Sequence, residues 1–191
     1  LTVTVPVGAT YQPILVLKNG LLASTSTPFL VTFGGSDITT ASFATKVDLA
    51  TGSRPWGIAM GDFDEDGKVD VAVVNSSSLT VSIFRNNSTT TGTISYAAKV
   101  DLTTGSTPRS VAIGDFDGDG KIDLAVGNYS TSTVSVFRNT SNTVGTISFA
   151  DKVDKTTGTT PWSVAVGDFD EDGKADLVTG NQDNTLSIFR N

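Results

Sequence analysis

The stretch GDFDEDGKVDVAV, at residues 61–73, recurs as GDFDGDGKIDLAV at 114–126 and as GDFDEDGKADLVT at 167–179. The three copies begin 53 residues apart. Prolines and aromatic residues keep the same interval, at Pro55, Pro108 and Pro161 and at Phe43, Tyr96 and Phe149. A fixed period of this length indicates a repeat architecture in which each unit is one supersecondary element.

The spacing of a second motif locates a deletion. The Phe-Arg-Asn triplets at 84–86, 137–139 and 189–191 are spaced 53 and then 52 residues apart. The third unit is therefore one residue shorter, and its turn-forming residues 182–184 are the expected place. Each triplet ends an alternating apolar run, so its phenylalanine is predicted to be a core residue.

Within one unit, the alternation of apolar and polar residues predicts four short strands. In the second unit these are 110–113, 122–126, 133–137 and 147–153, separated by turns rich in Asp, Gly, Ser and Asn. Four antiparallel strands in about 50 residues are typical of a β-propeller blade. We therefore predict an all-β fold with almost no helix and with three blades of a partial β-propeller, at about 54–101, 107–154 and 160–191. Residues 43–48 are similar to the fourth strand of a blade and could pair with the last one.

Each repeated stretch holds a loop with aspartates at positions 1, 3, 5 and 9 and glycine at position 6. Four carboxylates so close together repel one another unless a cation lies among them. Oxygen-only ligands and a flexible loop favour Ca²⁺, and glycine permits the sharp turn that directs the position-7 carbonyl to the ion. We predict three Ca²⁺ sites with lysine side chains pointing into solvent. The ligands are Asp62, Asp64, Asp66, Lys68 and Asp70; Asp115, Asp117, Asp119, Lys121 and Asp123; and Asp168, Asp170, Asp172, Lys174 and Asp176.

These loops begin like an EF-hand loop but lack its glutamate at position 12, where Val73, Val126 and Thr179 stand. Residues 43–191 resemble FG-GAP/VCBS repeats, the blades of integrin α-type β-propellers. That resemblance implies Ca²⁺ loops of the form D-x-D-x-D-G-x-x-D between the first two strands of each blade. All three loops match this form. The ions are expected to stabilise the hairpins rather than to capture a ligand.

Residues 1–40 lie outside the repeat, and strands are expected at 1–7, 14–17 and 29–33. The runs LTVTVPVGATYQPILV and TPFLVTF resemble the C-terminal half of an IPT/TIG immunoglobulin-like domain, as found before such repeats in bacterial surface proteins. We therefore expect two domains, 1–40 and 41–191, in a window cut from a longer polypeptide.

Composition excludes several functions. The chain has 191 residues, 13 basic and 20 acidic, with neither histidine nor cysteine. It cannot form an imidazole or thiolate metal site, a Ser-His-Asp triad or a disulfide, and it lacks the basic surface that nucleic acids require. It contains no apolar run long enough to span a membrane. Fourteen of the acidic residues lie in the three loops, so the charge of −7 predicts a metal requirement.

Two functions fit this sequence. The first is a calcium-binding extracellular module for adhesion, scaffolding or interaction with a protein or glycan, within a secreted or cell-surface protein of a bacterium. The second is an accessory or catalytic propeller of a secreted enzyme acting on polysaccharide or lipid. We favour the non-enzymatic function, because no polar cluster is seen to break the repeat symmetry. Three blades cannot close a ring, so further blades from the same or another chain are expected.

Three residues occupy one equivalent position, directly after the repeated proline: Trp56, Arg109 and Trp162. Packing between blades is the favoured interpretation. A direct contact with a glycan or peptide is the alternative.

Overall fold

The computed structural model describes residues 15–18, 21–24, 37 and 39–191. Contacts divide the chain into two units, Leu1–Lys46 and Val47–Asn191. In the first unit, β1 (Leu15–Lys18) pairs antiparallel with β2 (Leu21–Ser24). Strand β1 agrees with the expected strand at 14–17, whereas β2 was not anticipated. The strands expected at 1–7 and 29–33, and with them most of the immunoglobulin-like resemblance, lie outside the described residues.

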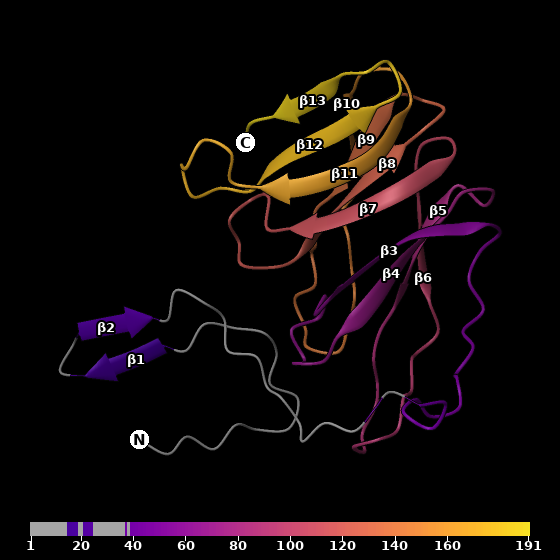
Figure 1. Ribbon diagram of the computed structural model, residues 1–191, viewed down its shortest axis with the longest axis vertical. Coiled ribbons are helices and arrows are strands. Elements are labelled where there is room, and N and C mark those ends of the chain that lie inside the picture. The colour runs from indigo at the N-terminus through magenta and orange to yellow at the C-terminus, as the bar shows by residue number, and fades with distance from the viewer. Residues whose placement is uncertain (1–14, 19–20, 25–36, 38) are drawn as a thin grey trace. The chain divides into compact units, whose positions relative to one another are not determined.

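The second unit consists of three antiparallel sheets that follow one another along the chain (Figure 1). The first has the order β3 (Pro55–Gly61), β4 (Asp70–Asn75), β5 (Thr80–Phe84) and β6 (Val100–Thr103). The second has the order β7 (Pro108–Gly114), β8 (Asp123–Asn128), β9 (Thr133–Phe137) and β10 (Val153–Thr156). The third has β11 (Pro161–Gly167), β12 (Asp176–Asn181) and β13 (Leu186–Phe189).

These sheets confirm the all-β class and the three-unit division, and the described residues contain no helix. The described part of the chain accordingly has no helix that could cross a membrane. Two expectations need correction. The third sheet has three strands rather than four, and residues 43–48 belong to no strand. The shorter turn of the third unit lies between Asn181 and Thr185, which are joined by a backbone hydrogen bond.

The fourth strand of each complete sheet also lies later than expected. In the second unit it is Val153–Thr156 rather than 147–153, and the preceding residues make only a single bridge, between Asn139 and Phe149. Ile147 and Phe149 instead pack against the core between the first and second sheets. Their apolar side chains are partly buried against this core, so this segment turns inward before regular pairing begins.

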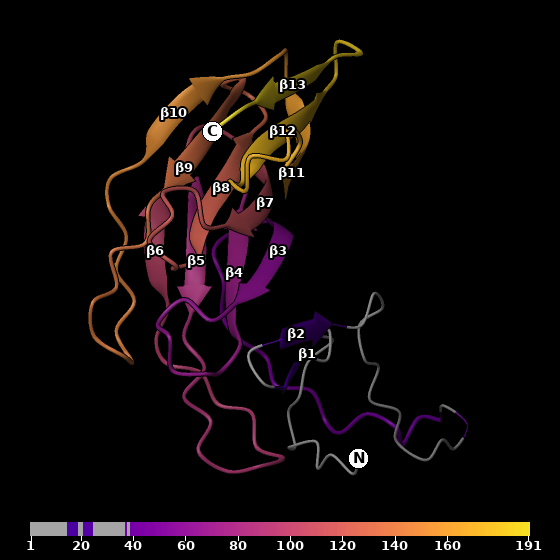
Figure 2. The same cartoon turned by 90° about the vertical axis from the view of Figure 1, so that its left-hand side faces the viewer.

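The core lies between successive sheets, which stack face against face (Figure 2). Alternation along the strands sends one set of side chains toward each neighbouring sheet. The first interface joins Ala72, Val74, Val81 and Ile83 of the first sheet to Leu124, Val126 and Phe137 of the second. The second interface is smaller and joins Ala125 and Val134 to Leu177. The predicted core residues Phe84 and Phe137 are buried, and Phe189 is partly buried against the second interface.

The first strands of the sheets are neighbours, and β7 lies beside both β3 and β11. This close approach explains the glycines that end β3 and β7, Gly61 and Gly114. A Cβ atom added at Gly114 would lie 2.9 Å from Val166 Cγ1 of the next sheet, closer than van der Waals contact allows. The arrangement places the three acidic loops, which follow these strands, at corresponding ends of adjacent sheets.

Candidate metal centre

Each acidic loop joins the first two strands of its sheet, between a glycine and an aspartate that are paired in register: Gly61 with Asp70, Gly114 with Asp123, and Gly167 with Asp176. The resemblance implied this position. Aspartates favour such turns because their short side chains accept hydrogen bonds from backbone N–H groups a few residues later.

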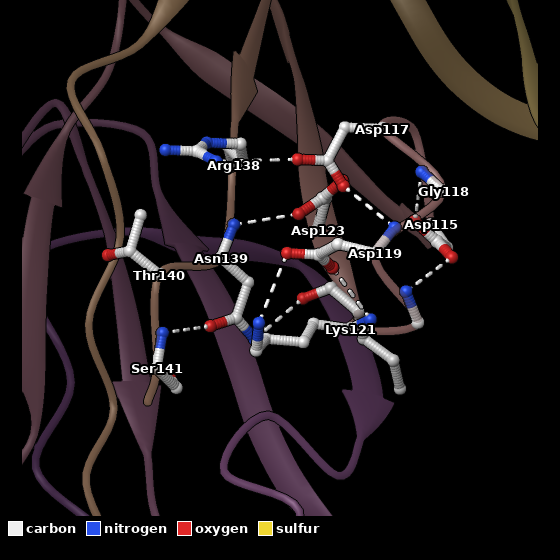
Figure 3. Close-up of polar contacts among 12 residues, drawn as sticks. Asp115, Asp117, Gly118, Asp119, Lys121, Asp123, Arg138, Asn139, Thr140 and Ser141 are labelled. Atoms are coloured by element: carbon white, nitrogen blue, oxygen red, sulfur yellow. Dashed lines mark hydrogen bonds and ion pairs between the residues drawn. The ribbon is translucent and has the colours of Figure 1, made fainter. Parts of the chain in front are cut away.

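The middle loop shows how the carboxylates shape the backbone (Figure 3). Asp115 accepts hydrogen bonds from the N–H groups of Gly118 at 2.8 Å and Gly120 at 2.9 Å. Asp119 accepts one from the N–H of Lys121 at 2.9 Å. These bonds wrap the chain around the carboxylates, so the loop is formed by the residues that would bind the cation.

Backbone conformation accounts for two loop positions. Position 6 has φ values of 81° at Gly67, 87° at Gly120 and 87° at Gly173, as the sharp turn requires. Position 4 also has positive φ, at 58° for Glu65 and 63° for Glu171. The sequence pattern had indicated no backbone role for these glutamates. Gly118, which occupies position 4 in the middle loop, was the signal in the sequence for a positive φ at this position.

The aspartate at position 9 fastens the loop to the third strand. Asp123 accepts a hydrogen bond from Phe116 N–H at 2.9 Å through one oxygen and from Asn139 N–H at 2.7 Å through the other. The same pair of bonds is made by Asp70 and by Asp176 in the other loops. All three side chains are buried. This aspartate therefore has a structural role even without a cation.

In each loop, three carboxylates each offer an oxygen atom, and these oxygens lie within 4.8 Å of one another. The groups are Asp62, Asp64 and Asp66; Asp115, Asp117 and Asp123; and Asp168, Asp170 and Asp176. The structure thus brings together nine of the expected aspartates. Asp70, Asp119 and Asp172 belong to the same loops but fall outside these tight groups.

A second observation in the first loop fits a cation. Asp64 Oδ2 is buried and has no hydrogen-bond partner, and the nearest cationic group is Arg85 Nη1 at 3.9 Å. Burial, together with the neighbouring charges of Asp66 and Asp62, raises the pKa of Asp64 above its usual range. A carboxylate that is buried, crowded by like charges and left with one oxygen that accepts no hydrogen bond would be stabilised by a divalent ion. This donor set of hard oxygens therefore fits Ca²⁺.

Basic side chains also reach the carboxylates, and the expectation that the loop lysines point into solvent is wrong for Lys68 and Lys121. Lys68 Nζ lies 2.8 Å from Asp66 Oδ2, and Lys121 Nζ lies 3.1 Å from Asp119 Oδ2. The lysine thus folds back onto the position-5 aspartate, because its ammonium relieves the repulsion among the carboxylates. Lys174 Nζ is farther from its aspartate, at 4.0 Å.

The arginine of each Phe-Arg-Asn triplet lies beside the position-3 aspartate of the same sheet. The distances are 3.9 Å for Arg85 to Asp64, 3.6 Å for Arg138 to Asp117 and 3.3 Å for Arg190 to Asp170. The repeated triplet had predicted a role only for its phenylalanine. The arginine follows the position-3 aspartate by 21 residues in the first two units and by 20 in the third, and this near-constant spacing was the signal that could have linked the arginine to the site.

The three loops share a sequence pattern but differ in burial. The position-2 phenylalanine is fully buried at Phe63, partly buried at Phe116 and 50% exposed at Phe169. Phe63 contacts Phe149 of the second sheet edge to face, with ring centroids 6.1 Å apart. The exposure of this phenylalanine therefore shows how far the following sheet packs over each loop.

The three position-9 aspartates differ in the direction of their pKa shift. Desolvation raises the pKa of Asp70 and Asp123 and outweighs the hydrogen bonds that each carboxylate accepts from the backbone. At Asp176 the equivalent bonds, from Asn191 and Phe169, lower the pKa. The charges also differ: neighbouring carboxylates raise the pKa of Asp70 and Asp123, whereas Arg190 and Lys174 lower that of Asp176. Desolvation and nearby charge together therefore decide the sign.

The fold and the loops together define a repeat protein built from antiparallel sheets with an acidic hairpin loop in each. The family model for the FG-GAP-like repeat matches residues 62–126 and again residues 115–179, which together make up more than half of the chain. The chain therefore belongs to the FG-GAP-like repeat family. No curated protein matches it.

Proposed function

We propose that this chain is a calcium-binding, propeller-like extracellular module of a secreted or cell-surface protein, and that it acts in adhesion or in interaction with other molecules. The observation that carries the proposal is the close grouping of three carboxylates in each of three equivalent loops. The orphaned oxygen of Asp64 supports it, because that atom needs a positive partner.

In this proposal the ions are structural. The loop aspartates and the carbonyl of the position-7 lysine would hold Ca²⁺, which would neutralise carboxylate repulsion and fix the hairpin. Because Asp70, Asp123 and Asp176 join each loop to the third strand, ordering the loop also orders the sheet. Extracellular Ca²⁺, near millimolar, suits modules with dissociation constants of about 10⁻⁴–10⁻³ M.

The proposal extends to the larger protein. We propose that the sheets are blades of an integrin α-type arrangement, completed by further blades, and that an IPT/TIG-like segment precedes them. A binding role is favoured over a catalytic one because the carboxylates recur identically in three loops and are committed to backbone bonds and to the cation. A bacterial cell-surface or secreted setting is part of the same proposal.

Calcium titration tests the metal requirement. At a Ca²⁺ concentration 100 times the dissociation constant, each occupied site adds about 2.7 kcal/mol to the free energy of unfolding. For a chain of this size, one site would raise the melting temperature by roughly 5–10 °C. The protein is stripped with EDTA, dialysed and melted by circular dichroism with Ca²⁺ or with Mg²⁺ at equal ionic strength. A melting temperature unaffected by Ca²⁺ would refute the proposal.

A further inference from the structure

A cluster of one arginine and three aromatic rings lies where the three sheets meet at their first strands. Arg109, at the start of β7, lies with its Cζ atom 4.8 Å from the ring centroid of Trp56 on β3 and 4.2 Å from that of Trp162 on β11. The ring centroid of Tyr129, which follows β8, is 3.7 Å away. The guanidinium is thus enclosed by rings from all three sheets, so the expected packing between blades is present.

This cluster breaks the repeat symmetry, and the expectation that no polar cluster does so is wrong. Arg109 stands where the other units have tryptophan, and Tyr129 stands where they have Ser76 and Gln182. The Tyr129 hydroxyl donates a hydrogen bond to Gln182 Oε1 at 2.9 Å, which ties the ring to the third sheet. A feature present once among repeated units is a candidate for a function that the repeat alone does not need.

Arg109 has no anionic partner among the described residues. Its Nε and Nη1 atoms are buried and make no hydrogen bond. By contrast, Arg138 and Arg190 each lie against an aspartate. A guanidinium always carries its charge, and buried donors left unpaired are costly. Cation–π contacts compensate for part of this cost, but they leave the N–H groups in the guanidinium plane without hydrogen-bond acceptors. The third guanidinium nitrogen, Nη2, is not among these buried atoms, so an anion supplied from outside would approach Arg109 at Nη2 and reach the buried donors by a shift of the surrounding rings.

The aromatic rings restrict what carries that anion. Trp56 is 50% exposed and Trp162 is 47% exposed, so large parts of both indoles remain free for contact. A guanidinium fork matches the two oxygens of a carboxylate, and indole faces pack against flat apolar surfaces. An acidic sugar combines a carboxylate with the C–H face of a ring. An acidic peptide would also offer carboxylates, but peptides gain much of their affinity from a strand edge or a groove rather than from one cation between rings.

We propose that Arg109, Trp56, Trp162 and Tyr129 form a binding site for the carboxylate of an acidic sugar residue, such as a uronic acid, with the indole rings against the sugar. This inference specifies a ligand for the proposed binding module, but it does not depend on Ca²⁺ in the loops. No loop aspartate is needed for the contact.

The test uses the fact that the chain has two tryptophans, both within this cluster. Tryptophan fluorescence, excited selectively, therefore reports on the site alone. The intact chain, kept at constant Ca²⁺ and moderate salt, is titrated with a glucuronate-containing tetrasaccharide and with its carboxyl-reduced form. We expect a saturable change with the first and at least tenfold weaker binding of the second. Absence of a saturable change, or equal binding of the two, would overturn the proposal.

Variants separate binding from packing. R109Q should weaken binding at least tenfold, whereas K155Q, which removes an exposed positive charge on β10, should alter it less than twofold. R109W is expected to fold, because the other two repeats already carry tryptophan at this position, and its binding is measured by calorimetry. It should melt normally and lose binding. Equal affinity of R109W and the parent chain would refute the site, as would tighter Arg109-dependent binding of polyglutamate than of the tetrasaccharide.

The results of the sugar-binding experiments can be told apart from those of the calcium titration. A chain that is stabilised by Ca²⁺ but does not bind the sugar would refute this inference alone. Arg109-dependent sugar binding by a chain whose melting temperature does not respond to Ca²⁺ would support this inference and refute the metal proposal.

Discussion

Asn139 donates a hydrogen bond from its side-chain Nδ2 to the backbone carbonyl of Phe63, at 2.8 Å, across the interface between the second sheet and the first. The same nitrogen reaches the carbonyl of Ile122 at 3.0 Å, beside the second acidic loop. Its backbone N–H donates to Asp123. Asn191 repeats the arrangement with the carbonyl of Phe116 at 2.6 Å. One asparagine thus joins its own acidic loop to the loop of the preceding sheet.

Replacing Asn139 should therefore weaken the contact between sheets. We expect Asn139→Ala to lower the free energy of unfolding by about 1–3 kcal/mol, because buried carbonyls lose their donor. Asn86→Ala is the matched control, since Asn86 holds the same place in the first sheet but its Nδ2 bonds only to Val69 among the described residues. Urea denaturation measures both. Equal losses in the two variants would contradict the role of the contact between sheets.

Substitutions at Asp123 and Asp119 should distinguish a structural role of a loop aspartate from a metal-binding role. In EDTA, Asp123→Asn should cost about 1–3 kcal/mol, because the new amide cannot accept the hydrogen bonds of both Phe116 and Asn139. Asp119→Asn should change the melting temperature little in EDTA, because Asp119 is exposed. With Ca²⁺ added, Asp119→Asn should show a smaller gain than the parent chain. A full gain would remove Asp119 from the ligand set.

Acid stability should depend on a pair of aspartates outside the loops. Burial opposes ionisation of Asp101, but hydrogen bonds from Lys99 and Ser82 outweigh it and lower the pKa of Asp101 below 3.8. Lys152 and Ser135 likewise lower the pKa of Asp154, again against the effect of burial. A depressed pKa stabilises the folded state above pH 3.8, and this contribution is lost as the pH falls through the folded-state pKa.

The double variant D101N/D154N tests that assignment. Its stability, measured by urea denaturation from pH 5 downward, should fall less steeply than that of the parent chain below about pH 4. The measurements are made in EDTA so that calcium release does not contribute. Parallel curves for the two proteins would show that these aspartates do not control the acid transition.

Glycine at the end of β7 tests the packing between sheets. Gly114→Ala should destabilise the protein by about 1–3 kcal/mol, because its Cβ would lie 2.9 Å from Val166 Cγ1. Gly167→Ala is the control, since its Cβ would meet only Phe169 of its own loop, at 3.2 Å. Thermal unfolding in EDTA compares the two. If Gly167→Ala were the more damaging, close approach of β7 and β11 would not explain the glycine.

The sequence by itself determined the elements that form from short-range interactions. The 53-residue period fixed the units, alternation located the first three strands, and the aspartates with the glycine at position 6 defined the loops. Their hydrogen bonds link residues only a few positions apart, so the pattern contains nearly all the information that shapes them. The fourth strand was placed too early because Ile147 and Phe149 pack against another sheet.

The tertiary structure alone decided how equivalent residues differ. Asp123 and Asp176 hold equivalent positions and accept equivalent backbone hydrogen bonds, yet their pKa values shift in opposite directions. Desolvation and neighbouring carboxylates prevail at Asp123, whereas hydrogen bonds and nearby basic groups prevail at Asp176. Arg109 looked like one variant of a repeated position until the packing of three sheets brought Trp56 and Trp162 around it. Such contacts join residues a whole repeat apart, and their distances follow from how sheets stack rather than from local preferences.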